Sequence, residues 1–269
     1  MQSFEKKLDN LTRNSWFYIA IMAAMFTIPT IAQQPFDSRN MADLIADVMK
    51  NAFIYRYPAL FPIFKIIPIV LVGYIFLKGE KATRVFDIYA ASILLITAIF
   101  QNMAITEDYG RVMLLGNQVI LGLLALLWIW EAIVKKNSFV RKKRPIGKYW
   151  VFLPAFLASW FPMETQTLQP DFSPGLIFTS EAGLTWCMIM PLILALLAFF
   201  EPDINYPLAR ITAFLGISLA IMNLLNWFVF SQHLWLGILH LPLLILSIHV
   251  WVLSRKKKAP GMEINERER

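Results

Sequence analysis

Long apolar segments separated by short polar ones recur along the whole chain. Eight segments are candidates to cross a membrane, at about residues 15–32, 59–78, 86–105, 111–134, 148–163, 185–200, 207–230 and 233–254. A hydrocarbon core of about 30 Å needs roughly 20 residues of helix, and most of these segments approach that length. The fifth has the weakest pattern, because Pro154 and Pro162 interrupt it. The pattern therefore predicts an all-α polytopic membrane protein with eight transmembrane helices.

The two halves of the chain can be aligned with each other, from about 16 to 134 and from about 150 to 254. The alignment pairs Trp16 with Trp150, Pro68 with Pro191, Asn102 with Asn226 and, after one gap, Tyr109 with His233. Because each half holds an even number of helices, the two copies would be parallel repeats, and membrane proteins commonly place binding sites between such repeats. The sequence predicts a first four-helix unit (1–134), a basic cytoplasmic linker (135–148), a second four-helix unit (149–258) and a disordered tail (259–269).

The first outer loop has a helical pattern of its own near residues 39–53. Its apolar positions recur three and four residues apart, opposite charged ones, and Asp37 or Ser38 could cap the start. We expect an amphipathic helix on the outer surface, where it would act as a strut or lid over the bundle. Alternatively, it could take part in gating or dock a partner.

The composition agrees with a membrane protein, since 58% of the 269 residues are apolar and 14% are aromatic. The net charge of +7 reflects basic residues gathered in the tails and the even-numbered loops. The exceptions are Arg39, Lys50, Arg56, Lys65 and Arg111. By the positive-inside rule, both termini are expected in the cytoplasm, and the outer surface is expected to be acidic.

The charge distribution also bears on partners and on the compartment. We expect the basic linker to set topology and to touch anionic lipid, rather than to bind nucleic acid. The lone Cys187 cannot form an internal disulfide, which fits a prokaryotic cytoplasmic membrane. The bilayer is the expected partner, with a homo-oligomer or a membrane complex as further possibilities.

Polar side chains inside the apolar segments are the candidate site. Counted from the outer ends of their helices, several lie in one layer roughly 6 to 10 Å deep. The candidate residues for a ligand or a pathway are Asn102, Asn117, Gln118, Asn223, Asn226, Trp227 and His240. Each amide could equally be an interhelical contact worth about 0.6 kcal/mol. Glu107, Asp108 and His233 would lie at the outer mouth, where carboxylates either attract cations or form a solvated rim.

The sequence predicts neither a metal site nor a catalytic motif. All three histidines lie in the last segment, and His233 and His240 share a helix face about 10 Å apart, too far for one metal ion. No nucleophile, zinc or phosphate-loop motif occurs, so an enzyme is not predicted, although a site assembled from separate helices stays open. No cofactor is identified. Glu131 and Lys135, four residues apart, are expected to form a local pair.

These patterns favour translocation of a small solute or ion through a polar site between the two repeats. The inner halves of the segments are almost wholly apolar, so no continuous polar route to the cytoplasm is visible. Two alternatives stay open. One is an outward-facing subunit that binds a lipid, quinone or pigment within a larger complex, and the other is a non-catalytic membrane scaffold.

Overall fold

The computed structural model describes residues 2–164, 167–230 and 233–256, so the expected disordered tail lies outside the described residues. The first half of the chain is mainly helical, with three short strands. Its elements are α1 (Gln2–Leu11), α2 (Ser15–Thr27), β1 (Ile31–Ala32), η1 (Ser38–Asn40), α3 (Met41–Lys50), η2 (Phe53–Arg56), η3 (Pro58–Leu60), α4 (Phe61–Lys78), α5 (Glu80–Phe100), β2 (Met103–Thr106), β3 (Gly110–Met113) and α6 (Leu115–Val134).

The second half has helical elements throughout. They are η4 (Ile146–Val151), α7 (Phe152–Trp160), α8 (Leu176–Thr179), η5 (Glu181–Leu184), α9 (Trp186–Phe200), α10 (Tyr206–Leu225), the π-helical turn η6 (Asn226–Phe230) and α11 (Leu234–Lys256).

Among the described residues, five helices are long and apolar enough to cross a membrane. They cover Pro58–Lys78, Glu80–Phe100, Leu115–Val134, Tyr206–Phe230 and Leu234–Arg255. A sixth span results if Leu176–Leu184 and Trp186–Phe200, which meet at 95°, count as one. The chain is therefore mostly helical, with five or six long apolar helices that could span a membrane.

Two of the eight predicted segments form shorter helices than their apolar runs suggested. α2 has 13 residues, because the chain leaves the helix at Ile28, just before Pro29. α7 has only 9 residues and ends where Phe161 adopts a left-handed backbone conformation with φ of 54°. The following Pro162 also lacks the N–H needed to continue the helix.

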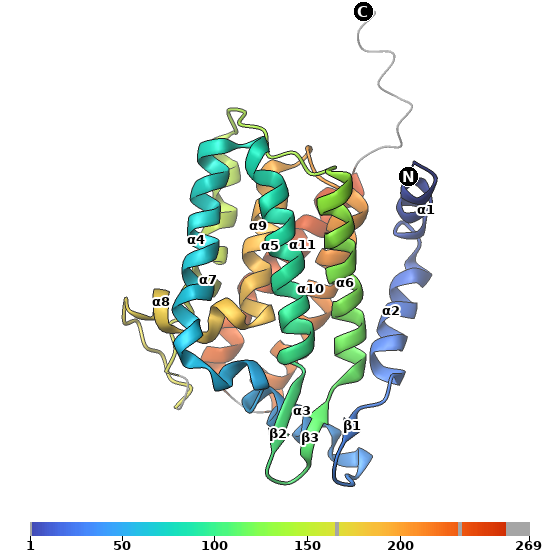
Figure 1. The fold of residues 1–269 in the computed structure, drawn as a ribbon, viewed down its shortest axis with the longest axis vertical. Coiled ribbons are helices and arrows are strands. Elements are labelled where there is room, and N and C mark those ends of the chain that lie inside the picture. The colour runs from blue at the N-terminus through green and yellow to red at the C-terminus, as the bar shows by residue number, and fades with distance from the viewer. Residues whose placement is uncertain (1, 165–166, 231–232, 257–269) are drawn as a thin grey trace, which may run out of the picture.

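The long helices lie side by side along the long axis of the molecule (Figure 1). The N-terminus and the linker that follows α6 lie at one end, and the strands lie at the other. In the first half α2 packs against α6, α4 against α5 and α5 against α6; in the second half α7 packs against α11, α9 against α10 and α10 against α11. The second half is more closed, because α9 also packs on α7 and α11.

Helix α9 fills the space between the two halves. Every residue of α9 is buried except Cys187 and Leu192, which are half-buried, and the helix contacts α5 as well as α7, α10 and α11. A helix that is apolar on all sides belongs in a core. The predicted seam between the halves is therefore packed with side chains at this helix.

The predicted amphipathic stretch and the connection between α5 and α6 form a small layer at the end opposite the linker. β2 and β3 are an antiparallel hairpin, and β1 pairs with the other edge of β3. Leu44 and Val48 of α3 pack on Ala104 and Val112 of this sheet. The α3 helix thus covers the sheet with its apolar face.

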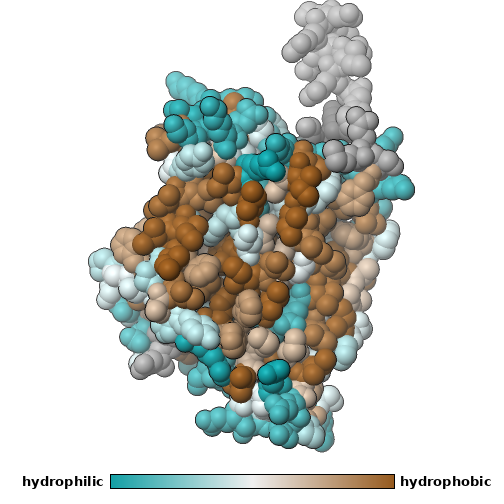
Figure 2. Space-filling model, in the orientation of Figure 1, coloured by the Kyte–Doolittle hydropathy of each residue, from teal (hydrophilic) through white to brown (hydrophobic). Residues whose placement is uncertain are grey.

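The middle of the molecule presents apolar side chains to its surroundings. Figure 2 shows a broad hydrophobic band between hydrophilic ends on the face in view. Exposed apolar side chains of the long helices include Val70 and Leu77 of α4 and Leu126 and Ile133 of α6. An apolar surface of this extent is what an integral membrane protein presents to lipid.

Candidate functional site

Two carboxyl groups are buried together near the linker end of the helices. Asp87 of α5 and Glu131 of α6 are both 0% exposed. Asn137 of the linker and Asn205, which precedes α10, are buried beside them. These four residues, which we call the carboxyl–amide cluster, come from the first half, the linker and the second half of the chain. The cluster therefore lies where the two halves are joined.

Hydrogen bonds connect all four members of the cluster. The Asn137 side chain donates to Asp87 Oδ1 at 3.0 Å, while its backbone N–H donates to Glu131 Oε1 at 2.5 Å. The Asn205 side chain donates to Glu131 Oε2 at 2.5 Å, and its backbone N–H donates to Asn137 Oδ1 at 2.8 Å. Asp87 Oδ2 is buried and has no hydrogen-bond partner among the described residues. Glu131 is thus satisfied on both oxygens, whereas Asp87 is satisfied on one.

Local backbone structure places these groups. Lys135 ends α6 in a left-handed conformation with φ of 56°, which turns the linker back so that Asn137 faces the helices. Asn205 is the N-cap of α10, and its side-chain oxygen accepts from Leu208 N at 3.4 Å. The expected Glu131–Lys135 pair is wrong, since the Glu131 carboxylate bonds Asn137 and Asn205 while Lys135 is exposed.

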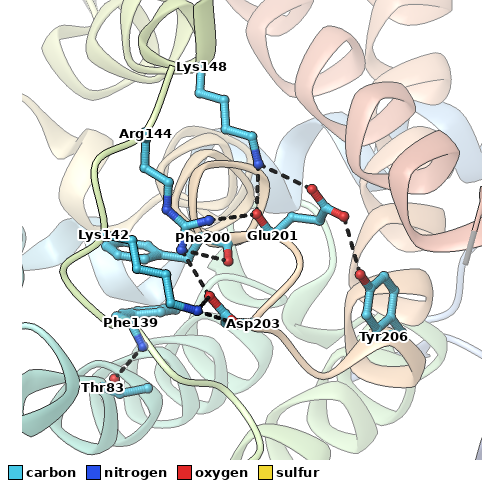
Figure 3. A network of polar contacts seen from close by, with 9 residues as sticks. All are labelled: Thr83, Phe139, Lys142, Arg144, Lys148, Phe200, Glu201, Asp203 and Tyr206. Atoms are coloured by element: carbon cyan, nitrogen blue, oxygen red, sulfur yellow. Dashed lines mark hydrogen bonds and ion pairs between the residues drawn. The ribbon is translucent and has the colours of Figure 1, made fainter. Parts of the chain in front are cut away.

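The rest of the linker is held against the end of α9, as Figure 3 shows. Arg144 donates to Glu201 O at 2.9 Å and to Asp203 Oδ2 at 3.1 Å. Lys142 also pairs with Asp203, and Lys148 with Glu201. The linker was expected as a topogenic loop that touches lipid, but three of its basic side chains bind carboxylates and carbonyls of this protein. We call these contacts the linker clamp.

Charge pairing in the linker clamp shifts the titration of Asp203. Partial burial alone would raise the pKa of Asp203, but hydrogen bonds and charge attraction from Lys142 and Arg144 outweigh it and lower the pKa below 3.8. Asp203 is thus a carboxylate at neutral pH, where it can pair with both Lys142 and Arg144 in the linker clamp.

The polar residues predicted in the first half connect α5 to its own neighbours. Asn102 donates to the carbonyls of Thr97 and Ala98 within α5. Gln118 of α6 donates to Ile99 O at 3.0 Å and so joins α6 to α5. Asn117 lies half-buried one residue earlier in α6. Gln118 thus makes an interhelical contact of the kind weighed above, whereas Asn102 bonds to carbonyls of α5 alone.

In the second half, the structure brings together Trp227, His233 and His240. The Trp227 ring lies 6.1 Å from the His233 ring and 6.4 Å from the His240 ring. His240 Nδ1 is 2.7 Å from Leu236 O. Asn223 bonds Leu219 O at 2.8 Å and Cys187 Sγ at 3.5 Å, and Asn226 begins the π-helical turn η6.

The predicted residues fall into two groups, one in each half of the chain. No hydrogen bond or ring contact links Asn102, Asn117 or Gln118 with Asn223, Trp227 or His240 within the described ranges. Glu107 and Asp108, expected at the outer mouth, are exposed in the turn between β2 and β3.

Gln101 makes the contact across the seam that was expected of its neighbour Asn102. Its side-chain oxygen accepts from Trp186 N of α9 at 2.9 Å, and its amide lies 3.3 Å from the Tyr55 hydroxyl. Tyr55 in turn lies 3.0 Å from the Thr185 hydroxyl. These contacts use polar groups to fix the start of α9 against the first half.

Sequence reasoning missed Asp87 and Asn205 as site residues. The third apolar segment was expected to begin at residue 86, which put Asp87 at the membrane surface, but α5 begins at Glu80 and places it about 10 Å along the helix. An acidic residue two turns inside a long apolar helix is the feature that could have identified it.

The described residues contain no group of three or more His, Cys, Asp or Glu side chains arranged to hold a metal ion. The carboxyl–amide cluster offers carboxyl and amide oxygens, which can bind protons or hard monovalent cations. Its chemistry is therefore that of an acid–base or small-cation site.

Comparison of the chain with models of known protein families, with characterised proteins and with solved structures found no match.

Proposed function

We propose that the protein is an integral membrane protein that translocates protons, with Asp87 as the proton carrier and Glu131 as its partner. The observation that carries this proposal is Asp87, which is fully buried in an apolar helix with Oδ2 unpartnered among the described residues. A buried carboxylate with one oxygen left unpaired is costly, and acids inside membrane helices commonly mark ion pathways. Protonation removes the charge of Asp87, and a proton can bind to this carboxylate without a cavity beside it.

The position of the carboxyl–amide cluster supports the same proposal. It joins α5 and α6 of the first half to Asn205 of the second half, so protonation of Asp87 can affect how the two halves pack against each other. It replaces the outer polar layer as the centre of the proposed pathway, while keeping that pathway between the two halves. The proposed architecture is eight helices in two parallel four-helix repeats, which the corresponding helix pairings support.

In this proposal the structure is an occluded form. On the route outward from Asp87 along α5, Ala90, Leu94 and Ala98 are buried apolar residues. Helix α9 closes the space beside them. Proton release to the outer side would require α9 to move relative to α5, and the polar contacts of Gln101 with the start of α9 would be the ones to break.

The proposed orientation places the linker end in the cytoplasm. The basic linker and the basic residues of both tails fit the positive-inside rule. The proposed location is a prokaryotic cytoplasmic membrane, with the sheet and α3 on the outer side.

Proton flux into liposomes tests the proposal. The purified protein is reconstituted with a pH-sensitive dye inside the vesicles, and an imposed pH gradient with valinomycin and potassium provides the driving force. We expect flux from the native protein and a loss of at least about tenfold in Asp87→Asn, which keeps the size of the side chain. Asp43→Asn at an exposed position of α3 is the matched control and should retain full flux.

Folding of each variant is checked by its elution from a sizing column in detergent. Equal flux in a folded Asp87→Asn protein and in the native protein would reject Asp87 as carrier. No proton flux from the native protein would reject translocation of protons and leave the alternatives below.

The alternative is an outward-facing subunit that binds an amphipathic ligand. The observation that favours it is the Trp227 indole Nε1, which is buried without a hydrogen-bond partner among the described residues, beside His240. A carbonyl-bearing lipid, quinone or pigment could accept from it. An absorbance spectrum and native mass spectrometry of the mildly purified protein would reveal such a ligand. A protein with neither flux nor ligand would fit the scaffold interpretation.

A further inference from the structure

Three arginines that are not part of the carboxyl–amide cluster meet at the linker end of the molecule. Arg13 in the turn between α1 and α2, Arg210 in the second turn of α10 and Arg255 near the end of α11 line a cavity of about 170 Å³. We call this cavity the arginine pocket. Its walls come from segments at the start and the end of the chain, so the folded protein assembles it.

The pocket carries more positive than negative charge. Asp9 is the carboxylate that pairs with these arginines: its Oδ2 lies 3.0 Å from Arg13 Nε, and its Oδ1 pairs with Arg210. Arg255 forms no ion pair with any described residue and instead lies 4.3 Å over the Trp251 ring. Three guanidinium groups line the pocket and Asp9 pairs with two of them, which leaves an excess of positive charge for an anion.

Arg210 has hydrogen-bonding capacity that the described residues do not use. Its side chain is 1% exposed, and its Nη1 donates to Thr12 Oγ1 at 2.9 Å and to Asp9 O at 3.2 Å. Its Nε is buried and has no hydrogen-bond partner among the described residues. A buried N–H without an acceptor is unfavourable, so an anionic oxygen that reaches Nε would be bound strongly.

The surroundings of the pocket are typical of a membrane interface. Trp16 at the start of α2 is 59% exposed, and Tyr18 and Trp251 pack edge to face beside Arg255. Tryptophan and tyrosine concentrate at the level of lipid headgroups. An anion held by these arginines would thus lie at that level.

We propose that the arginine pocket binds a phosphate-bearing anion, with the headgroup of an anionic phospholipid as the source that the surrounding aromatic residues favour. Guanidinium groups suit phosphate because their paired N–H groups match its oxygens. Basic pockets between helices on the cytoplasmic side are known to take such headgroups. The pocket shares no residue with the carboxyl–amide cluster, so the two sites can be tested independently.

Binding to the full-length protein in a neutral detergent tests the proposal. The probes are short-chain phosphatidylglycerol, short-chain phosphatidylcholine and inorganic phosphate, and the readouts are the midpoint of thermal unfolding and native mass spectrometry. Arg255→Gln is the test variant, because Arg255 is exposed and outside every ion pair of the described residues. Arg84→Gln removes the same charge from an exposed position on α5 outside the pocket and is the control.

We expect phosphatidylglycerol to raise the unfolding midpoint of the native protein and of Arg84→Gln, and its affinity to fall about tenfold in Arg255→Gln. Phosphatidylcholine should have a much smaller effect, because its headgroup has no net charge. Tight binding of inorganic phosphate with the same loss in Arg255→Gln would support the site and identify a soluble phosphate as its ligand. Equal effects of Arg255→Gln and Arg84→Gln on every probe would overturn the proposal.

Discussion

Phe139 of the linker stacks on Phe200 at the end of α9, with ring centroids 4.3 Å apart and ring planes inclined by 19°. Phe139 is 0% exposed and also packs against Phe86 of α5. The backbone N–H of Phe139 donates to Thr83 Oγ1 at 2.9 Å. An apolar anchor in a strongly basic segment thus holds the linker between the two halves.

Replacing this anchor should loosen the connection between the halves. Phe139→Ala removes a fully buried ring and leaves a cavity, so the free energy of unfolding should fall by about 3 to 5 kcal/mol. Equilibrium unfolding in mixed detergent micelles measures the change. Ile146→Ala is the control, since that side chain is 89% exposed and its loss should change stability by less than about 0.5 kcal/mol. Similar losses in both variants would show that Phe139 does not anchor the linker.

The linker clamp should depend on pH through Asp203. Its pKa is lowered in the folded protein, so its contribution to stability is present above about pH 3.8 and is lost as the pH falls through the folded pKa. Protease cleavage of the linker should therefore accelerate in the native protein at and below about pH 3.8. In Asp203→Asn the cleavage should be faster already at neutral pH and should vary less with pH. The exposed Asp108→Asn variant should retain the native profile, and a native-like profile in Asp203→Asn would contradict the assignment.

Asn205 should matter for two separable reasons, as the cap of α10 and as the donor to Glu131 Oε2. Asn205→Ala removes both and leaves the buried Glu131 Oε2 without its donor, so we expect a loss of about 2 to 4 kcal/mol in the free energy of unfolding. Asn205→Ser keeps a good capping oxygen and should recover about 1 kcal/mol of that loss.

Combining Asn205→Ala with Glu131→Gln checks the carboxylate part of this prediction. If the unpaired Glu131 Oε2 causes most of the loss, the double variant is more stable than the sum of the single changes predicts, by at least about 1 kcal/mol. Strict additivity would mean that Asn205 acts through the cap alone.

The long apolar helices could be predicted from the sequence, because a run of about 20 apolar residues has few other structures available. The strands β2 and β3 could not, since "MAIT" and "GRVM" are flanked by apolar helices and were read as their ends. Gly110, with φ of 65°, allows the turn between these strands. Helix α1 was taken for a polar tail, although its buried Leu8 packs on the core.

The carboxyl–amide cluster illustrates what a sequence pattern does not contain. The hydrogen bond from Asn205 to Glu131 joins residues 74 positions apart, and that from Asn137 to Asp87 joins residues 50 positions apart. Each asparagine lies in a polar connection, where its type is common and carries no distinguishing pattern. The general expectation of a site between the halves remains a prediction. The residues of the carboxyl–amide cluster could be identified only from the fold.

Gly183 allows η5 to approach the backbone of α4, next to Lys65, which is buried and donates to Ser180 Oγ at 2.8 Å. A Cβ at Gly183 would lie 2.7 Å from the carbonyl carbon and oxygen of Phe64. Gly183→Ala should therefore push η5 away from α4 and lower the free energy of unfolding by about 1 to 3 kcal/mol. Gly175→Ala is the matched control, because a Cβ there meets no atom within 4 Å and its φ of −56° suits alanine. Equilibrium unfolding of the two alanine variants compares them directly, and equal stability would mean that the close approach of η5 to α4 is not needed for the fold.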